Sequence, residues 1–316
     1  MARLTDTVLF EQFIDDLKKQ DRTQRTIESY GSSIRIFQEY LHSRKCSFLS
    51  VDGWDNKELL EDFLVYLREV RKLSYGTIKD YYCALNSFYG FLSYRGYIKQ
   101  NMVLDVRKRY VHQFKNGYTP AERKIIDVDE MSRFLNGITE LRAKVVALLF
   151  VKTGVRRGEL IHMDVDDIDF MENSITLKPI FRKRTNTTVY FDEETAIMLK
   201  RWLKRRETLV GPNEKALFVS DFGTRLQRRG IYDCIVKWAT ILGYNNVKSD
   251  KIKDHFTVHN LRHCFTTYLS RAGMPRNYIQ ELRGDKHSAV VDLYTHIDKK
   301  DLRKSYLSFM PKFNVY

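Results

Sequence analysis

The feature that most limits how this chain can fold is a helical spacing of apolar residues, which recurs through its first third. The first stripe runs through Ile27, Tyr30, Ile34, Phe37 and Leu41. Because an α-helix completes a turn every 3.6 residues, steps of three and four place these side chains on one face. Thr23 or Thr26 can cap the helix. Two further stripes, at 60–70 and 78–92, predict that residues 1–112 form a small helical bundle.

A polar and basic stretch at 99–124 interrupts this periodicity. It contains Gly117 and Pro120, two residue types that break regular structure. We interpret the stretch as the connection between two domains, with the linker itself at 113–124. A length of 316 residues also favours two domains, since most domains have about 50–250 residues.

Residues 125–316 combine helix and strand patterns, which predicts a second domain. Asp127 or Asp129 can cap its first helix, and the apolar run at 144–152 has the length of a buried helix. Three short runs then alternate with a period of two, the spacing of half-buried strands. They lie at 168–170, 175–177 and 188–191. The expected fold class is therefore mainly α with a small antiparallel β-sheet (α+β).

The charge of the chain favours a polyanionic partner. Its 54 Lys and Arg residues exceed its 40 Asp and Glu residues, which gives a net charge of +14. A protein this basic most often binds nucleic acid, although a merely solvated basic surface is the alternative. The helical bundle carries basic residues opposite its apolar stripes, so it suits a clamp on the backbone of double-stranded DNA. Examples are Arg68, Arg71, Lys72 and Lys79.

The cysteines and the apolar runs bear on the compartment. The four cysteines are scattered and form no Cys-x-x-Cys pair, so buried free thiols are expected and a zinc site is not. No apolar run approaches the roughly 18 residues of a membrane helix. Acidic residues also come too early in the sequence for a signal peptide. We expect a cytoplasmic protein.

Residues that can carry chemistry gather at 259–294. His259 and Arg262 are three residues apart at the start of a run with helical spacing, so both side chains can point at one anion. The run stops at Gly273, and a second short helix ends before Gly284. The chain then reaches Tyr294.

Two basic segments precede this stretch. Arg156 follows the buried helix directly, in the sequence TGVRRGEL, and a guanidinium on a rigid element suits an oxyanion. Taken alone, this pattern fits a helix end with a solvated arginine better than an oxyanion site. The predicted hairpin between the second and third strands has a basic tip that can enter a DNA groove. Its basic residues are Lys178, Arg182, Lys183 and Arg184.

With these segments in order, the chain resembles the tyrosine recombinases, the group of phage integrases and Xer-type recombinases. The family's Thr-Gly-x-Arg-x-x-Glu-Leu box stands here at 153–160, its His-x-x-Arg-His box at 259–263 and its Tyr-Thr-His-like segment at 294–296. The resemblance extends over nearly the whole length. It implies a helical core-binding domain followed by a catalytic domain.

The resemblance also implies a mechanism, in which one DNA strand is cut at a time through a 3′-phosphotyrosyl intermediate. Tyr294 is then the nucleophile, and Arg156 and Arg262 bind the scissile phosphate. His259 would hydrogen-bond the same phosphate, and Lys183 would protonate the departing 5′-oxygen. Neither a metal nor another cofactor is implied, and the sequence has no P-loop.

The chain departs from the family pattern in three places. Nine residues before the tyrosine, where the family usually has histidine, the sequence has Asp285, and His287 lies two residues later. We favour His287 as the catalytic residue, because an aspartate donates no proton to phosphate unless it is protonated. Lys178 is the alternative to Lys183 in the hairpin. Arg157 is a second candidate for the first arginine.

The preferred function is a site-specific recombinase, the integrase of a mobile element or virus. A Xer-type recombinase that resolves chromosome or plasmid dimers shares this chemistry, as does a type IB topoisomerase. A DNA-binding regulator that has lost catalysis is the alternative from another class. Recombination joins two duplexes, so a homo-oligomer on DNA, a tetramer by analogy, is expected. The predicted tail helix at 302–309 is the candidate for a contact exchanged between copies.

Overall fold

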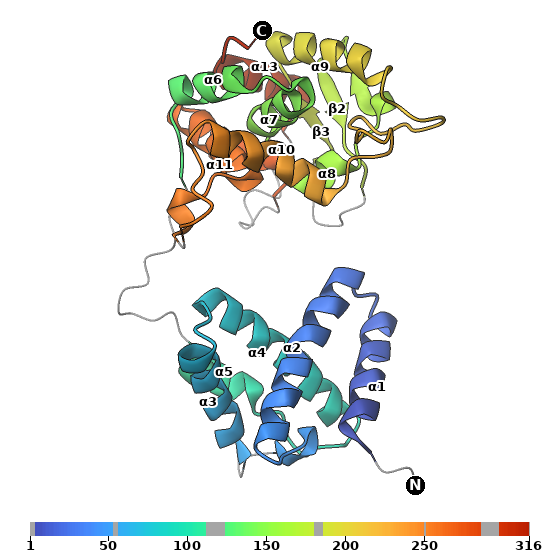
Figure 1. The fold of residues 1–316 in the computed structure, drawn as a ribbon, viewed down its shortest axis with the longest axis vertical. Coiled ribbons are helices and arrows are strands. Elements are labelled where there is room, and N and C mark those ends of the chain that lie inside the picture. Colours follow the sequence, from blue (N-terminus) through green and yellow to red (C-terminus); the bar gives the residue numbers. More distant parts are fainter. Residues whose placement is uncertain are drawn as a thin grey trace. The chain divides into compact units, whose positions relative to one another are not determined.

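The computed structural model describes residues 4–52, 56–111, 124–179, 186–249, 251–285 and 297–315. The chain divides into two compact units, Met1–Thr119 and Pro120–Tyr316. Figure 1 shows the helices and strands of each unit. The division falls within the predicted linker, which lies outside the described residues apart from Lys124.

The first unit is built from helices around one apolar core, which is rich in phenylalanine and tyrosine. The Thr23 hydroxyl accepts a hydrogen bond from the backbone N–H of Thr26 and so caps the second helix. Ile34, Phe37 and Leu41 of the first predicted stripe are fully buried. The helices are α1 (Asp6–Lys19), α2 (Gln24–Ser43), α3 (Glu58–Val65), α4 (Tyr75–Tyr94) and α5 (Val103–Tyr110).

Helix α5 corrects the prediction that all of 99–124 connects the domains. Half of its residues are charged, but Val103 and Val106 lie one turn apart and both are buried. These two side chains belong to the core of the first unit, and α5 packs against α3 and α4. The flanking Met102 and Val111 are buried in the same core, so the first unit continues beyond residue 99.

The second unit is arranged around one buried helix, α7 (Leu141–Thr153), which contacts α9, α10 and α11 (Figure 1). Every residue from Val145 to Thr153 is buried. The Asp127 carboxylate caps α6 by accepting from the backbone N–H of Glu130. The other helices are α6 (Val128–Gly137), α8 (Arg157–Ile161), α9 (Glu193–Arg206), α10 (Arg228–Ile241), α11 (Val258–Arg271), α12 (Arg276–Arg283) and α13 (Lys299–Phe309).

The three predicted strands form one antiparallel sheet in the order β1–β2–β3. Ile175 in β2 is opposite both Ile168 and Val189. Asn173 adopts a left-handed conformation (φ 50°) at the turn between β1 and β2, as asparagine tolerates. The fold class is thus the predicted one, mainly helical with a small sheet. The strands are β1 (Ile168–Asp169), β2 (Ser174–Thr176) and β3 (Thr188–Tyr190).

The C-terminal residues pack on the second unit itself. Leu302 and Tyr306 of α13 are buried against α11 and α12. The segment after α13 is also docked, since Phe313 and Val315 are buried in the main core. Exchange of α13 between copies of the protein therefore stays a proposal about the assembly on DNA.

Candidate active site

Gly154 brings the end of α7 close to α11. It has a left-handed backbone (φ 60°), and a Cβ atom there would lie 2.4 Å from the ring of Phe265 in α11. Glycine is the residue that satisfies both conditions. The chain then turns sharply and places Arg156 immediately before α8. The glycine of the sequence box therefore allows the turn that positions this arginine.

Glu159 fixes the position of Arg156. The buried Glu159 carboxylate accepts from the Arg156 backbone N–H at 2.7 Å and from its Nη1 at 3.0 Å. One carboxylate thus holds both the main chain and the side chain of Arg156. The neighbouring Arg157, which was the alternative candidate, lies over the ring of Tyr232 at 5.9 Å.

Arg262 lies at the junction of three elements. Its Nη1 donates to the carbonyl of Gly154 at the end of α7, and its Nη2 donates to the carbonyl of Arg283 at the end of α12, 3.1 Å away. The side chain of Arg262 is only 11% exposed. Both carbonyls come from helix ends, whose oxygens lack partners within the helix. Arg262 therefore donates hydrogen bonds to the ends of two helices and also places a positive charge in the site.

The carboxylate of Asp285 joins the two predicted arginines. Its Oδ1 accepts from Arg156 Nη2 at 2.8 Å and lies 3.4 Å from Arg262 Nη2. Its Oδ2 lies 2.9 Å from Nε of Arg283. Gly284 ends α12 in a left-handed conformation (φ 60°) and turns Asp285 into this position. Three arginines from separate parts of the sequence thus surround one anionic group.

The electrostatics of this cluster favour an anion. Burial, together with repulsion from Arg156 and Arg283, lowers the pKa of Arg262 to about 9, while Asp285 opposes this shift. The guanidinium is still charged at neutral pH. A buried cation beside two like charges gains free energy from each negative group that reaches it. The arrangement can bind and polarise a tetrahedral oxyanion such as a phosphate.

The structure places the remaining predicted residues as follows. His259 is exposed on the first turn of α11, three residues before Arg262. Lys183, His287 and Tyr294 lie outside the described residues. The structure therefore brings together Arg156 and Arg262 of the predicted set. Sequence reasoning overlooked Arg283, whose only signal was its position just before the Gly284 helix stop.

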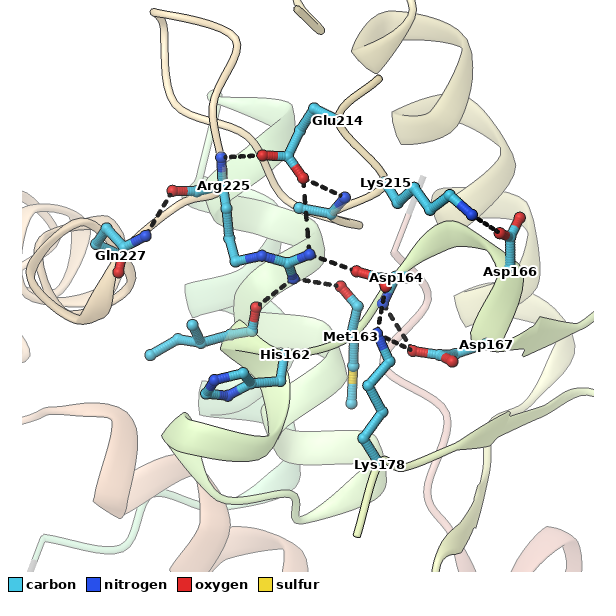
Figure 2. Close-up of polar contacts among 12 residues, drawn as sticks. His162, Met163, Asp164, Asp166, Asp167, Lys178, Glu214, Lys215, Arg225 and Gln227 are labelled. Atoms are coloured by element: carbon cyan, nitrogen blue, oxygen red, sulfur yellow. Dashed lines mark hydrogen bonds and ion pairs between the residues drawn. The ribbon is translucent and has the colours of Figure 1, made fainter. Parts of the chain in front are cut away.

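Lys178, the alternative hairpin lysine, belongs to a second polar cluster (Figure 2). Its Nζ is paired with the carboxylate of Asp164 and lies 3.8 Å from that of Asp167. Asp164 also accepts from Nη2 of Arg225 at 2.5 Å. Arg225 in turn donates to the carbonyl of Ile161, the last residue of α8. This cluster fastens the base of the β2–β3 hairpin to α8, which follows Arg156.

Asp164 should therefore contribute to stability in a pH-dependent way. Burial alone would raise the pKa of Asp164, but hydrogen bonds from Lys178 and Arg225 outweigh it and lower the pKa. A lowered carboxyl pKa stabilises the folded state above the ordinary aspartate value of about 4, and the stabilisation is lost as the pH falls through the folded value. Asp164→Asn is expected to cost about 2 kcal/mol at pH 7.

Urea unfolding of both proteins between pH 7 and pH 3 tests this expectation. The difference in unfolding free energy should shrink as the pH falls, because the wild type loses the same charge. A difference that is constant with pH would contradict it. Asp166→Asn is the matched control, since Asp166 lies two residues away, is largely exposed and pairs only loosely with Lys215, at 3.7 Å.

Two properties of the described residues bear on other classes of function. In that part of the chain, no group of three or more His, Cys, Asp or Glu side chains is arranged to hold a metal ion. None of the helices within the described ranges is long and apolar enough to span a bilayer.

Comparison with known proteins identifies the class to which this fold and arginine cluster belong. The phage integrase family matches residues 124–301, and the N-terminal SAM-like domain of phage integrases matches residues 9–98. The chain therefore belongs to the phage integrase family. Its members are tyrosine recombinases, enzymes that cut and rejoin DNA through a phosphotyrosyl intermediate. The family and the chemistry predicted from the three sequence boxes are confirmed.

Similar proteins extend over almost the whole chain. Tyrosine recombinase XerC of Vibrio cholerae is 26% identical over 322 residues, which cover 94% of this chain and 97% of that protein. XerC of Oceanobacillus iheyensis is 25% identical, and the match covers 96% of each chain.

Two solved structures share the fold. The integrase of transposon Tn1549, in complex with transposon right end DNA, has a TM-score of 0.68 at 17% identity and covers 95% of this chain and 98% of that one. The XerH site-specific recombinase bound to difH substrate has a TM-score of 0.64 at 20% identity, and the match covers 96% of this chain and 84% of that one.

Proposed function

We propose that this protein is a site-specific recombinase that uses Tyr294 to cut double-stranded DNA and rejoins the ends to a different strand. The observation that carries the proposal is the convergence of Arg156 and Arg262 on one anionic group. Two guanidiniums from separate elements, one of them buried, form the kind of site that a scissile phosphate needs.

The proposed mechanism follows from this clamp. A free tyrosine has a pKa near 10, so it is a weak nucleophile at neutral pH. The charges of Arg156 and Arg262 favour the phenolate of Tyr294 and stabilise the negative charge that grows on the non-bridging oxygens. The tyrosine oxygen forms a bond to phosphorus while the bond to the 5′-oxygen breaks. The phosphotyrosine keeps the bond energy, so a second 5′-hydroxyl can reverse the step.

Three further side chains have proposed roles in proton transfer. His259, one turn from Arg262 on α11, hydrogen-bonds the phosphate and helps to move the tyrosine proton. Lys183 gives a proton to the departing 5′-oxygen. We retain Lys183 rather than Lys178 because Lys178 is paired with Asp164. His287 donates to the phosphate, a task that Asp285 does not perform as a carboxylate.

We place the protein with the integrases of mobile elements, and the Xer-type recombinases are the second candidate. The Tn1549 integrase supports the first and the XerC relatives support the second. Plasmids with two copies of the recombination site distinguish these two functions. Dimer resolution needs both sites in one molecule, whereas integration joins two molecules. We further propose a tetramer on DNA and, given four free cysteines, a reducing cytoplasm.

The experiment that tests the proposal compares wild type with Tyr294→Phe on DNA that carries the site and a nick beside the cut. The nick lets the short 5′-hydroxyl fragment diffuse away, which traps the covalent intermediate. Wild type should give a protein–DNA adduct on a denaturing gel, and Tyr294→Phe should give none, because phenylalanine has no nucleophilic oxygen. Tyr278→Phe, a change on α12, should keep the adduct. Adduct formation by Tyr294→Phe would assign the nucleophile to another tyrosine.

A further inference from the structure

We infer that Asp285 is an internal stand-in for the scissile phosphate, which holds Arg156 and Arg262 together until a phosphate of the DNA displaces it. The inference rests on the proposed function, because it concerns the same two arginines. It differs from the roles assigned above, since it gives the aspartate a competitive role and makes it a positioning residue.

The first support is the geometry of the shared oxygen. Arg156 Nη2 and Arg262 Nη2 both approach Oδ1 of Asp285, at 2.8 and 3.4 Å. The two arginines come from the α7–α8 turn and from α11, so the carboxylate links elements that are far apart in the sequence. A phosphate oxygen that bridged the same two guanidiniums would need the position that Oδ1 occupies. The carboxylate and the phosphate therefore exclude one another there.

The second support is the charge of the cluster. Arg262 is buried next to Arg156 and Arg283, and its pKa is lowered by burial and by these two cations. A negative charge is needed to hold these three cations close together, and Asp285 supplies it. Once a phosphate is present it supplies the same charge, and two anions in contact would repel one another.

The third support is access. The side chains of Arg156 and Asp285 are 37% and 31% exposed, whereas Arg262 is 11% exposed. An anion from solution can thus reach the shared position without unfolding the site. Because Asp285 already occupies this position, an anion must displace it in order to bind. A lone anion competes poorly with the tethered carboxylate. A phosphate that is held by the rest of a bound DNA site competes at a high effective concentration.

The test measures binding of inorganic phosphate to the full-length protein, from the shift of the thermal unfolding midpoint at constant ionic strength. Asp285→Asn keeps the shape of the side chain and removes its charge. It should bind phosphate about tenfold more tightly than wild type, which corresponds to about 1.4 kcal/mol. Adding Arg156→Gln should abolish this gain. An unchanged or weaker affinity in Asp285→Asn would overturn the inference, since a carboxylate that merely organises the site would help the anion to bind.

Matched variants keep the result interpretable. Asp221→Asn removes the carboxylate of another Asp–Arg pair, with Arg142, and should leave phosphate affinity unchanged. Asp285→Ser is a second neutral variant and replaces Asp285→Asn if that protein fails to fold. The measurement uses neither DNA nor Tyr294. A failure of the DNA cleavage assay would therefore leave this result standing, and a failure here would leave Tyr294 as the proposed nucleophile.

Discussion

Replacing Arg262 with alanine is expected to lower the rate of DNA cleavage by about a thousandfold, the effect of removing a preorganised charged donor from a transition-state site. Arg262 is the more buried of the two converging arginines, so its charge acts through a medium that screens it poorly. The measurement is the rate of adduct formation on the nicked DNA under single-turnover conditions, with the protein in excess.

Arg262 also completes the ends of α7 and α12, so folding must be separated from catalysis. Arg262→Lys keeps the charge but loses the fork of donors, and its rate should fall between those of wild type and Arg262→Ala. Arg271→Ala is the matched control, because Arg271 lies exposed in the last turn of the same helix. Cleavage by folded Arg262→Ala within tenfold of the wild-type rate would contradict the assigned role.

Replacing Lys152 with methionine is expected to cost about 3–5 kcal/mol of unfolding free energy, the range for removing one partner of a buried ion pair. The Lys152 side chain is fully buried at the end of α7. Its Nζ lies 2.5 Å from a carboxylate oxygen of Asp192 and is also paired with Glu194. Methionine would fill the space and leave two carboxylates without their cation.

Lys152 also fastens the C-terminal segment. Its Nζ donates to the carbonyl of Pro311 at 2.7 Å and lies 4.4 Å from the ring centre of Phe313. Glu194 accepts from the backbone N–H of Phe313 at 2.9 Å. Loss of Lys152 should therefore make the residues after α13 accessible to proteases at concentrations of urea at which the rest of the unit is folded.

Equilibrium unfolding in urea, followed by tryptophan fluorescence, measures the effect of Lys152→Met. Trp202 is buried in the core of the same unit and reports its unfolding. Lys204→Met is the matched control, an exposed lysine on α9 that should change stability by less than about 0.5 kcal/mol. A loss below 1 kcal/mol in Lys152→Met would mean that the buried pair is energetically neutral.

Much of the fold could be predicted because its elements have strong local signals. The stripe from Ile27 to Leu41 predicted α2, and the period-two runs predicted the strands β1, β2 and β3. Helix α5 lies within the predicted bundle at 1–112, but its own segment was interpreted as a connection, because half of its residues are charged. Its docking on α3 and α4 is a tertiary contact that no local pattern encodes.

The site was predictable only in part, for a related reason. Arg156 and Arg262 were found because each stands in a recognisable box next to a helix end. The contact of Asp285 with both depends on three separate helix ends meeting, and sequence spacing does not determine such a meeting. The bond between Asp164 and Arg225 likewise joins residues 61 apart and left no periodic signal.

The most direct test of the central claim is to identify the amino acid that becomes joined to DNA. The adduct formed on the nicked site would be digested with protease and nuclease, and the modified peptide located by mass spectrometry. The proposed mechanism predicts a single peptide that carries the nucleotide on Tyr294. A nucleotide on any other residue, or a DNA cleavage reaction that proceeds with no covalent adduct, would contradict it.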